Sequence, residues 1–248
     1  TLNIGKGKTV MLDSYFNNEY EKDAAGILQS HHYKWTEESN GGFSLFGYLF
    51  RSYGVKTKTL HEAPTKESLK NSDMYIIVDP DNNKEVTHPE YIQQKDIDVI
   101  YDWVKNGGVL VMMANDSANV ELSHFNNLAH RFGIHWSDTS RNMVKNNEFE
   151  TGAIHIPKHN EIFPSVNKVY IKEICLLKIH PPAKASITED GDIIMSVAKV
   201  GKGTVFAVGD PWFYNEYLDG RKLPAEYQNP LAARDLIQWL IKQTPKLN

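Results

Sequence analysis

The sequence of 248 residues contains a single cysteine, Cys175, which excludes an internal disulfide and any metal cluster built from cysteine thiolates. No apolar run approaches the roughly 20 residues of a membrane-spanning helix, and the amino terminus lacks the apolar segment of a signal peptide. The net charge is also small, because 27 basic and 31 acidic residues give a formal charge of -4. No block of basic residues is present, so we expect neither a nucleic-acid partner nor a membrane span.

Two groups of catalytic motifs are missing as well. The glycine pair in Asn40-Gly-Gly lacks the rest of a dinucleotide-binding fingerprint and the lysine of a phosphate-binding loop. No serine lies on the strand-to-helix turn that positions the nucleophile of α/β hydrolases. Nucleotide-phosphate binding of these two types and serine-hydrolase chemistry are therefore not expected.

The composition is that of an ordinary globular protein, with 41% hydrophobic and 23% charged residues. We find no repeat, low-complexity tract or linker, so we expect one domain over 1–248. Short apolar runs predict strands, and apolar residues at helical spacing predict helices. The strands are expected at 9–13, 55–60, 74–78, 109–113, 153–156, 168–179, 185–187, 193–200 and 204–208, and the helices at 40–54, 65–70, 91–106, 119–132 and 231–241.

The alternation of strands and helices with short connections predicts right-handed crossovers and a parallel sheet. The fold class is therefore α/β, with an open, mainly parallel sheet, helices on both faces, and an antiparallel extension formed by the later strands. Two polar stretches lack clear periodicity: 14–40, expected to be a long functional loop or lid, and 137–150, expected to be a loop.

Carboxylate or amide side chains follow four of the predicted strands: Asp13, Asp79, Asn115 with Asp116, and Asp210. The carboxyl ends of parallel strands share one edge of the sheet, so these groups are expected to converge. Together they could act as a general acid and base, bind a hard cation such as calcium, or accept hydrogen bonds from sugar hydroxyls. The alternative is that each aspartate caps the helix that follows it.

Two polar, aromatic segments supply the remaining candidates, one at 14–40 and one at 201–221. Tryptophan and tyrosine rings could pack against a sugar ring, and arginine or histidine could pair with a uronate carboxylate. Because adjacent strand residues point to opposite faces, only one of His31 and His32 is expected to face the site. The candidate catalytic residues are Asp13, Glu19, Asp79, Asp210 and Glu216, and the candidate binding residues are His32, Trp35, Asn115, Asp116, Arg141, Trp212, Tyr214, Asn215 and Arg221.

Several stretches resemble a known family: Asp13-Ser-Tyr-Phe-Asn-Asn-Glu19, Gly107-Gly-Val-Leu-Val-Met-Met-Ala-Asn115 and Gly201-Lys-Gly-Thr-Val-Phe-Ala-Val-Gly-Asp-Pro-Trp212. The family is a glutamine-amidotransferase-like domain of gut Bacteroidetes, associated with unsaturated rhamnogalacturonyl hydrolases. The resemblance covers nearly the whole chain. It implies a flavodoxin-like sheet, a saccharide-processing context, a fused or neighbouring glycoside hydrolase, and a periplasmic or secreted location.

One departure from class I amidotransferases limits what the resemblance implies. Those enzymes place a cysteine on the turn after the central strand, where this chain has Ala114-Asn115-Asp116. Cys175 lies within an apolar strand and is expected to be buried and inert, so amidotransferase activity is not expected. Two functions follow: a hydrolase acting on pectic, rhamnogalacturonan-type or other acidic oligosaccharides, or a non-catalytic saccharide-binding or accessory domain.

Overall fold

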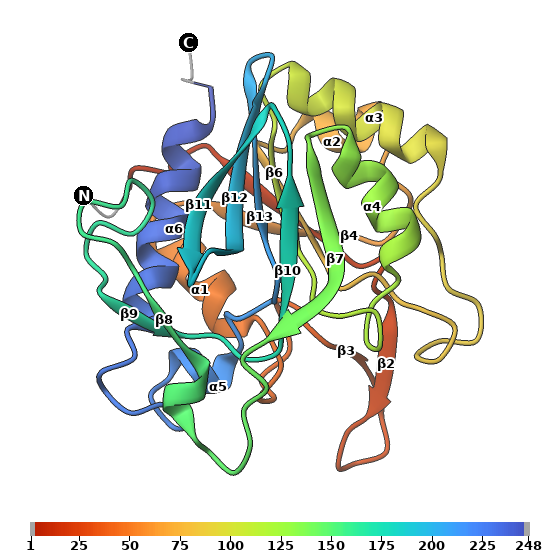
Figure 1. Ribbon diagram of the computed structural model, residues 1–248. Helices are drawn as coiled ribbons and strands as arrows, with labels where there is room; N and C mark the ends of the chain where they lie inside the picture. The colour runs from red at the N-terminus through yellow and green to blue at the C-terminus, as the bar shows by residue number, and fades with distance from the viewer. Residues whose placement is uncertain (1–2, 246–248) are drawn as a thin grey trace.

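The computed structural model describes residues 3–245 and contains a central sheet of nine strands (Figure 1). Five neighbouring strands are parallel, and their apolar residues are almost all buried because helices cover both faces. In sheet order these are β4 (Lys56–Leu60), β1 (Thr9–Asp13), β5 (Met74–Val78), β6 (Val109–Met113) and β13 (Gly203–Val208). The expected mainly parallel α/β sheet, consistent with a flavodoxin-like open sheet, is confirmed.

The antiparallel extension is confirmed as well. It continues the sheet beyond β13 with β12 (Asp192–Val200), β10 (Ile174–Ile179) and β7 (Ile134–Arg141), and β11 (Ala183–Glu189) pairs with β12. Two small hairpins lie outside this sheet. They are formed by β2 (Glu19–Lys22) with β3 (Leu28–His31), and by β8 (Ala153–His155) with β9 (Lys168–Tyr170).

The helices form a layer on each side of the sheet (Figure 1). Successive strand residues point to opposite faces, so β1 sends Val10 and Leu12 into one hydrophobic cluster and Met11 into the other. The first cluster includes residues of α1 (Ser44–Ser52) and α6 (Asn229–Gln243), and the second includes residues of α2 (Lys66–Lys70), α3 (Gln94–Lys105) and α4 (Leu122–His130). A short helix, α5 (Asn215–Leu218), follows β13, and a 3-10 turn, Phe149–Gly152, precedes β8.

Three expectations about local structure are corrected. The stretch 14–40 contains the β2–β3 hairpin, and 137–150 begins with the end of β7, which pairs with β10 although its sequence is polar. The predicted strand at 168–179 is two strands, because the chain leaves β9 after Tyr170 and Glu173 adopts a left-handed backbone with φ 52°. Over residues 3–245, none of the helices has the length and apolarity needed to cross a bilayer.

Candidate functional site

A cavity of about 280 Å³ lies at the carboxyl edge of the parallel strands. Asp79 follows β5, Asn115 follows β6 and Asp210 follows β13, and all three side chains line the cavity. The topology explains this convergence, because these three strands are neighbours that run in the same direction. The other lining residues come from connecting segments: Glu19, His32, Tyr33, Gly41, Glu85, Asn119, Lys172, Glu173, Tyr214, Glu216 and Tyr217.

Asp79 and Asp210 are the two deeply buried carboxyl groups of the cavity, with 5% and 3% of their surfaces exposed. Burial raises the pKa of Asp79 to about 7, although the Tyr33 hydroxyl and the Asn115 backbone N–H lower it. Burial and the neighbouring Asp79 charge raise the pKa of Asp210 well above its ordinary range, and Tyr214 opposes this rise. Near neutral pH, Asp79 is therefore poised between its two protonation states, and burial favours the protonated form of Asp210 as well.

Two tyrosines lie between these carboxyl groups. The Tyr33 and Tyr214 rings are stacked with their centroids 5.7 Å apart. The Tyr214 hydroxyl donates towards both Asp210 oxygens at 3.3 and 3.4 Å. His32 stacks on the other side of Tyr33, at 5.3 Å between centroids, and its Nδ1 lies 2.9 Å from Glu19 Oε1. These contacts form one wall of stacked rings with a carboxyl group near each member.

The backbone around the cavity is conformationally unusual. His32, Tyr33, Asp79 and Glu173 all line the cavity and have φ values of 57°, 60°, 37° and 52°. Residues other than glycine seldom adopt this left-handed region, and holding them there costs about 1–3 kcal/mol each where the site is strained. Such conformations persist where the surrounding structure enforces them, which supports a functional role for this cavity.

Two buried polar atoms of the cavity residues have no hydrogen-bond partner among residues 3–245: the Asn115 side-chain oxygen and the Tyr217 hydroxyl. Asn115 is 8% exposed and Tyr217 is 2% exposed. Leaving a buried polar atom unpaired costs about 1–3 kcal/mol, so both atoms are available to a ligand that can hydrogen-bond to them.

The structure brings half of the sequence-derived candidates to this cavity and places the others elsewhere. The candidates that line it are Glu19, His32, Asp79, Asn115, Asp210, Tyr214 and Glu216. Of these, Glu216 also forms an ion pair with Lys222 at 3.2 Å. The candidates outside the cavity are Asp13, Trp35, Asp116, Arg141, Trp212, Asn215 and Arg221, and each has a structural role.

The two aspartates outside the cavity shape local turns, but neither caps the following helix as the alternative predicted, because α1 begins only at Ser44 and the N-cap of α4 is Glu121. Asp13 accepts hydrogen bonds from the backbone N–H groups of Phe16 and Asn17 at 3.1 and 3.0 Å, and from the Tyr75 hydroxyl at 3.2 Å. Burial raises the pKa of Asp13. Asp116 accepts from the backbone N–H of Ala118 at 2.9 Å. Both carboxyl groups thus bind their own chain.

The two tryptophans belong to the hydrophobic core and offer no face to a ligand. Trp35 packs against Phe46 and Phe50 of α1 and donates its indole N–H to the Lys58 carbonyl at 2.9 Å. Trp212 is 0% exposed and lies against Phe213, with ring centroids 4.0 Å apart. An aromatic residue in a loop can pack inward as readily as it can face solvent, so the sequence did not distinguish the two cases.

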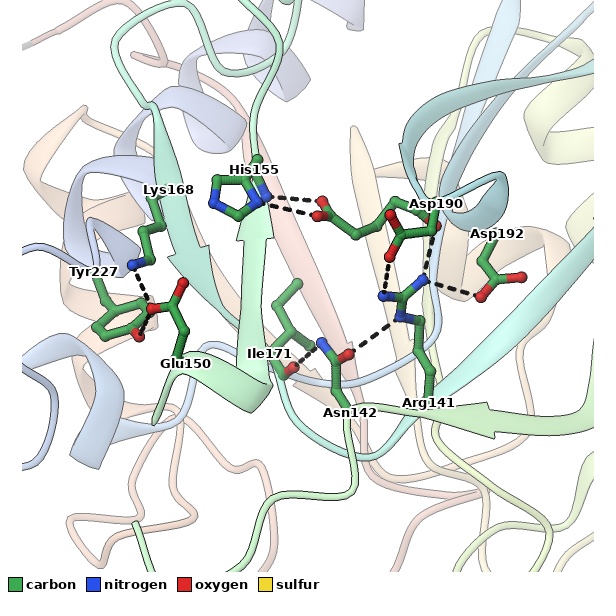
Figure 2. Close-up of polar contacts among 10 residues, drawn as sticks. Arg141, Asn142, Glu150, His155, Lys168, Ile171, Asp190, Asp192 and Tyr227 are labelled. Carbon is green, nitrogen blue, oxygen red and sulfur yellow. Dashed lines mark hydrogen bonds and ion pairs between the residues drawn. The ribbon is translucent and has the colours of Figure 1, made fainter. Parts of the chain in front are cut away.

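The arginines and Asn215 also serve the fold. Figure 2 shows Arg141 bound to Asp190 and Asp192, with N–O distances of 3.0 and 2.9 Å, so it ties the end of β7 to the β11–β12 turn. Arg221 contacts Asp219 and donates to the Asn40 side chain at 2.9 Å. Buried Asn215 bonds to segment 37–45.

Sequence reasoning missed several lining residues, most importantly Tyr33, Lys172 and Glu173. Tyr33 directly follows His32 in the sequence, and this position next to a candidate residue was the one indication that Tyr33 could line the site. Lys172 and Glu173 were assigned to the interior of one continuous strand, and only the break between β9 and β10 brings them to the cavity. Tyr217, in α5, was one of the rings expected to pack against a sugar, and it lines the cavity together with Tyr214.

Neither an amidotransferase centre nor a metal centre is formed by the described residues. Cys175 is 0% exposed within β10, and its thiol donates to the Ser137 carbonyl at 3.0 Å. Burial raises the pKa of this thiol to about 12, so it is protonated at neutral pH. Across residues 3–245, no three histidine, cysteine or acidic side chains are placed to hold a metal ion.

Known structures show where this architecture recurs. The mmIFT52 N-terminal domain is similar to the chain with a TM-score of 0.69 and 17% identity, over 94% of this chain and 97% of that one. The cytoplasmic protein STM1381 from Salmonella typhimurium LT2 is similar with a TM-score of 0.62 and 14% identity, over 96% and 100%. These similarities establish the fold alone.

A third similarity involves part of a larger protein. The exo-β-1,4-mannosidase Op5Man5 from Opitutaceae bacterium strain TAV5 has a TM-score of 0.53 and 14% identity, over 97% of this chain and 37% of the mannosidase. No protein-family model matches the sequence, and no curated protein matches it.

Proposed function

We propose that the chain is a saccharide-binding domain and that the cavity at the carboxyl edge of the sheet is its binding site. The observation that carries this proposal is the convergence of Asp79, Asn115 and Asp210 beneath the stacked Tyr33 and Tyr214 rings. Sugar hydroxyls both donate and accept hydrogen bonds, so they suit a mixture of carboxyl, amide and phenol groups. At about 280 Å³, the cavity is near the lower end of ligand pockets, which favours one sugar unit over an extended chain.

The charge of the cavity favours sugars that are not acidic. Six carboxyl side chains line it, whereas Lys172 and His32 are the basic ones, and His32 is paired with Glu19. A uronate would bring another negative charge to this group. Pectic and other acidic oligosaccharides remain the second ligand class to test, with Lys172 as the cation that would meet the uronate.

Association with a glycoside hydrolase, encoded beside the chain or fused to it, is part of the proposal. The family resemblance supports it, and so does the similarity of the fold to 37% of an exo-β-1,4-mannosidase chain. Membership of the glutamine-amidotransferase-like family and a periplasmic or secreted location belong to the same proposal.

Hydrolysis is a second candidate function, favoured by one observation. A carboxyl group with a pKa near 7 is suited to proton transfer, and Asp79 has this property. In this alternative Asp79 protonates the glycosidic oxygen, and Glu19, which also lines the cavity, is the candidate base or nucleophile. Binding without turnover would leave the first proposal intact and remove this one.

The test is a thermal-shift screen of neutral and acidic mono- and oligosaccharides, with chromatography of the products. A ligand at about 100 times its Kd adds about 2.7 kcal/mol to the stability of the native state. For a chain of this size, the melting temperature should then rise by roughly 5–10 °C. The shift should fall in Asp79→Asn and Asp210→Asn but persist in Asp102→Asn, which changes an exposed aspartate of α3. Failure of every saccharide to shift the wild type would refute the proposal.

A further inference from the structure

The cavity holds more carboxyl groups than basic groups, and several of these carboxyl groups have no cationic partner among the described residues. Within residues 3–245, Glu19 is paired with His32 and Glu216 with Lys222. Among the same described residues, the other four carboxyl groups of the cavity form no ion pair: Asp79, Glu85, Glu173 and Asp210. Lys172 is the single unpaired cation among the described lining residues. A cationic ligand would supply the missing positive charge.

A second, independent observation concerns an uncharged group. The Asn115 side-chain oxygen is a pure acceptor, is buried, and has no donor among the described residues. An ammonium group carries three N–H donors and no acceptor, so it matches this oxygen as well as the carboxylates.

We propose that the cavity receives the ammonium group of a free amino sugar, with the Asp79 and Asp210 carboxylates as its counter-charges and the Asn115 side-chain oxygen as an acceptor. This inference rests on the proposed saccharide function and specifies the class of sugar. The buried carboxyl groups release the protons that they otherwise hold to the buffer, and the bound ammonium group takes the place of these protons. The sugar hydroxyls provide an acceptor for the Tyr217 hydroxyl, which also lacks a partner.

The amino sugar differs from glucose in carrying an ammonium group in place of one hydroxyl. Isothermal titration of the wild-type chain at about pH 7.5 and low salt would compare glucosamine, glucose, N-acetylglucosamine and glucuronate. We expect glucosamine to bind at least about 10-fold more tightly than glucose or N-acetylglucosamine, and glucuronate to bind most weakly. Raising the salt concentration should weaken glucosamine binding and leave glucose binding nearly unchanged.

Substitutions in the cavity test whether the preference for glucosamine over glucose arises there. Asp79→Asn and Asp210→Asn keep the size of each side chain and remove its charge, so each should reduce the preference for glucosamine over glucose several-fold. Asp116→Asn makes the same change just outside the cavity and should leave the preference intact. The wild-type comparison stands even if a variant fails to fold, because it needs no substitution.

The outcomes separate the inference from the function on which it rests. Equal affinities for glucose and glucosamine would overturn the ammonium assignment and leave the saccharide site in place. A preference for glucuronate would overturn it too, because Lys172 would then dominate the charge of the cavity. Absence of binding by all four sugars would overturn both the inference and the proposed function.

Discussion

The rings of Tyr33 and Tyr214 stack at 5.7 Å although their residues come from the two ends of the chain. Tyr33 influences the protonation of Asp79, and Tyr214 donates to Asp210, so the stacked pair links two buried carboxyl groups. Carboxyl groups buried in this way cost the fold stability when they ionise, because burial disfavours the charged form. If the cavity needs Asp79 and Asp210 for binding, the protein keeps them there despite this loss of stability.

Asp79→Asn should stabilise the protein increasingly as the pH rises. Burial raises the pKa of Asp79 from 3.8 to about 7, so the wild type has this group's full contribution to stability below pH 3.8 and loses it as the pH rises through 7. Asparagine does not ionise, and its side-chain oxygen can still accept from the Asn115 backbone N–H at 3.0 Å. The advantage of the variant should grow from about pH 4 to about pH 7 and then stay constant, at about 4 kcal/mol at most.

Urea unfolding at several pH values measures this difference, with Asp102→Asn as the matched control. Asp102 is exposed on α3, so its substitution should change the free energy of unfolding by a small amount that is nearly constant with pH. A constant difference for Asp79→Asn as well would mean that Asp79 ionises normally in the native state.

Lys34→Met should destabilise the protein by about 2–4 kcal/mol. Lys34 is 3% exposed, and its Nζ donates to the backbone and side-chain oxygens of Asn17 at 2.6 and 2.9 Å. Burial lowers the pKa of Lys34, and the charge of Asp13 opposes that effect. Methionine would fill the space but leave the Asn17 oxygens without their donor and the Asp13 charge without its cation.

Chemical denaturation at neutral pH provides the measurement. Lys70→Met is the control, because Lys70 is exposed on α2 and its ion pair with Glu67, at 3.9 Å, should be worth less than about 1 kcal/mol. Equal and small effects of the two substitutions would show that the Lys34 contacts contribute nothing net to the fold.

Much of the fold could be predicted from the sequence because buried parallel strands are short apolar runs. Met74–Val78 and Val109–Met113 have no polar residue apart from the Tyr75 hydroxyl, and both were assigned correctly. The strand at 134–141 was missed altogether: residues 134–136 were assigned to no element, and 137–141 were expected to be a loop. Its second half is polar, and an edge strand that faces solvent needs no apolar pattern. This segment is a strand because it pairs with β10, and such long-range pairing cannot be read from the local sequence.

The site could be predicted where a side chain directly follows a central strand. Asp79, Asn115 and Asp210 meet because parallel order brings their strand ends together. Asp13 has the same position after β1, yet its carboxyl group turns back to cap the next residues, a choice made by local geometry that topology does not determine. Lys172 reaches the cavity through a chain reversal that its sequence does not indicate.

Asn215→Ala should loosen the segment around residues 37–45. The Asn215 amide donates to the carbonyls of Glu37 and Ser39, both at 2.9 Å, and its oxygen accepts from the Leu45 backbone N–H at 3.0 Å. Removal of these bonds should cost about 2–4 kcal/mol, since the bond to the Glu37 carbonyl is buried and the other two are partly buried. The amide of Leu45 should also exchange with solvent faster.

Hydrogen exchange measured by mass spectrometry tests this prediction at peptide resolution. Asn83→Ala is a control with an exposed asparagine and should leave the exchange of the 37–45 peptide unchanged. Unchanged protection of this peptide in Asn215→Ala would mean that other contacts hold the segment.

Cys175 should not react with thiol reagents while the protein is folded. The thiolate is the reactive form, and burial raises the pKa of this thiol to about 12, so almost none is present at neutral pH. The side chain is also 0% exposed, so a reagent must wait for β10 to open. Labelling with an aromatic disulfide should be slower on the order of 1,000-fold or more in the native protein than in strong denaturant, where one thiol per chain should react. Rapid labelling of the native protein would instead show that β10 separates from its neighbours at low cost, and the antiparallel extension would then be a locally unstable part of the sheet.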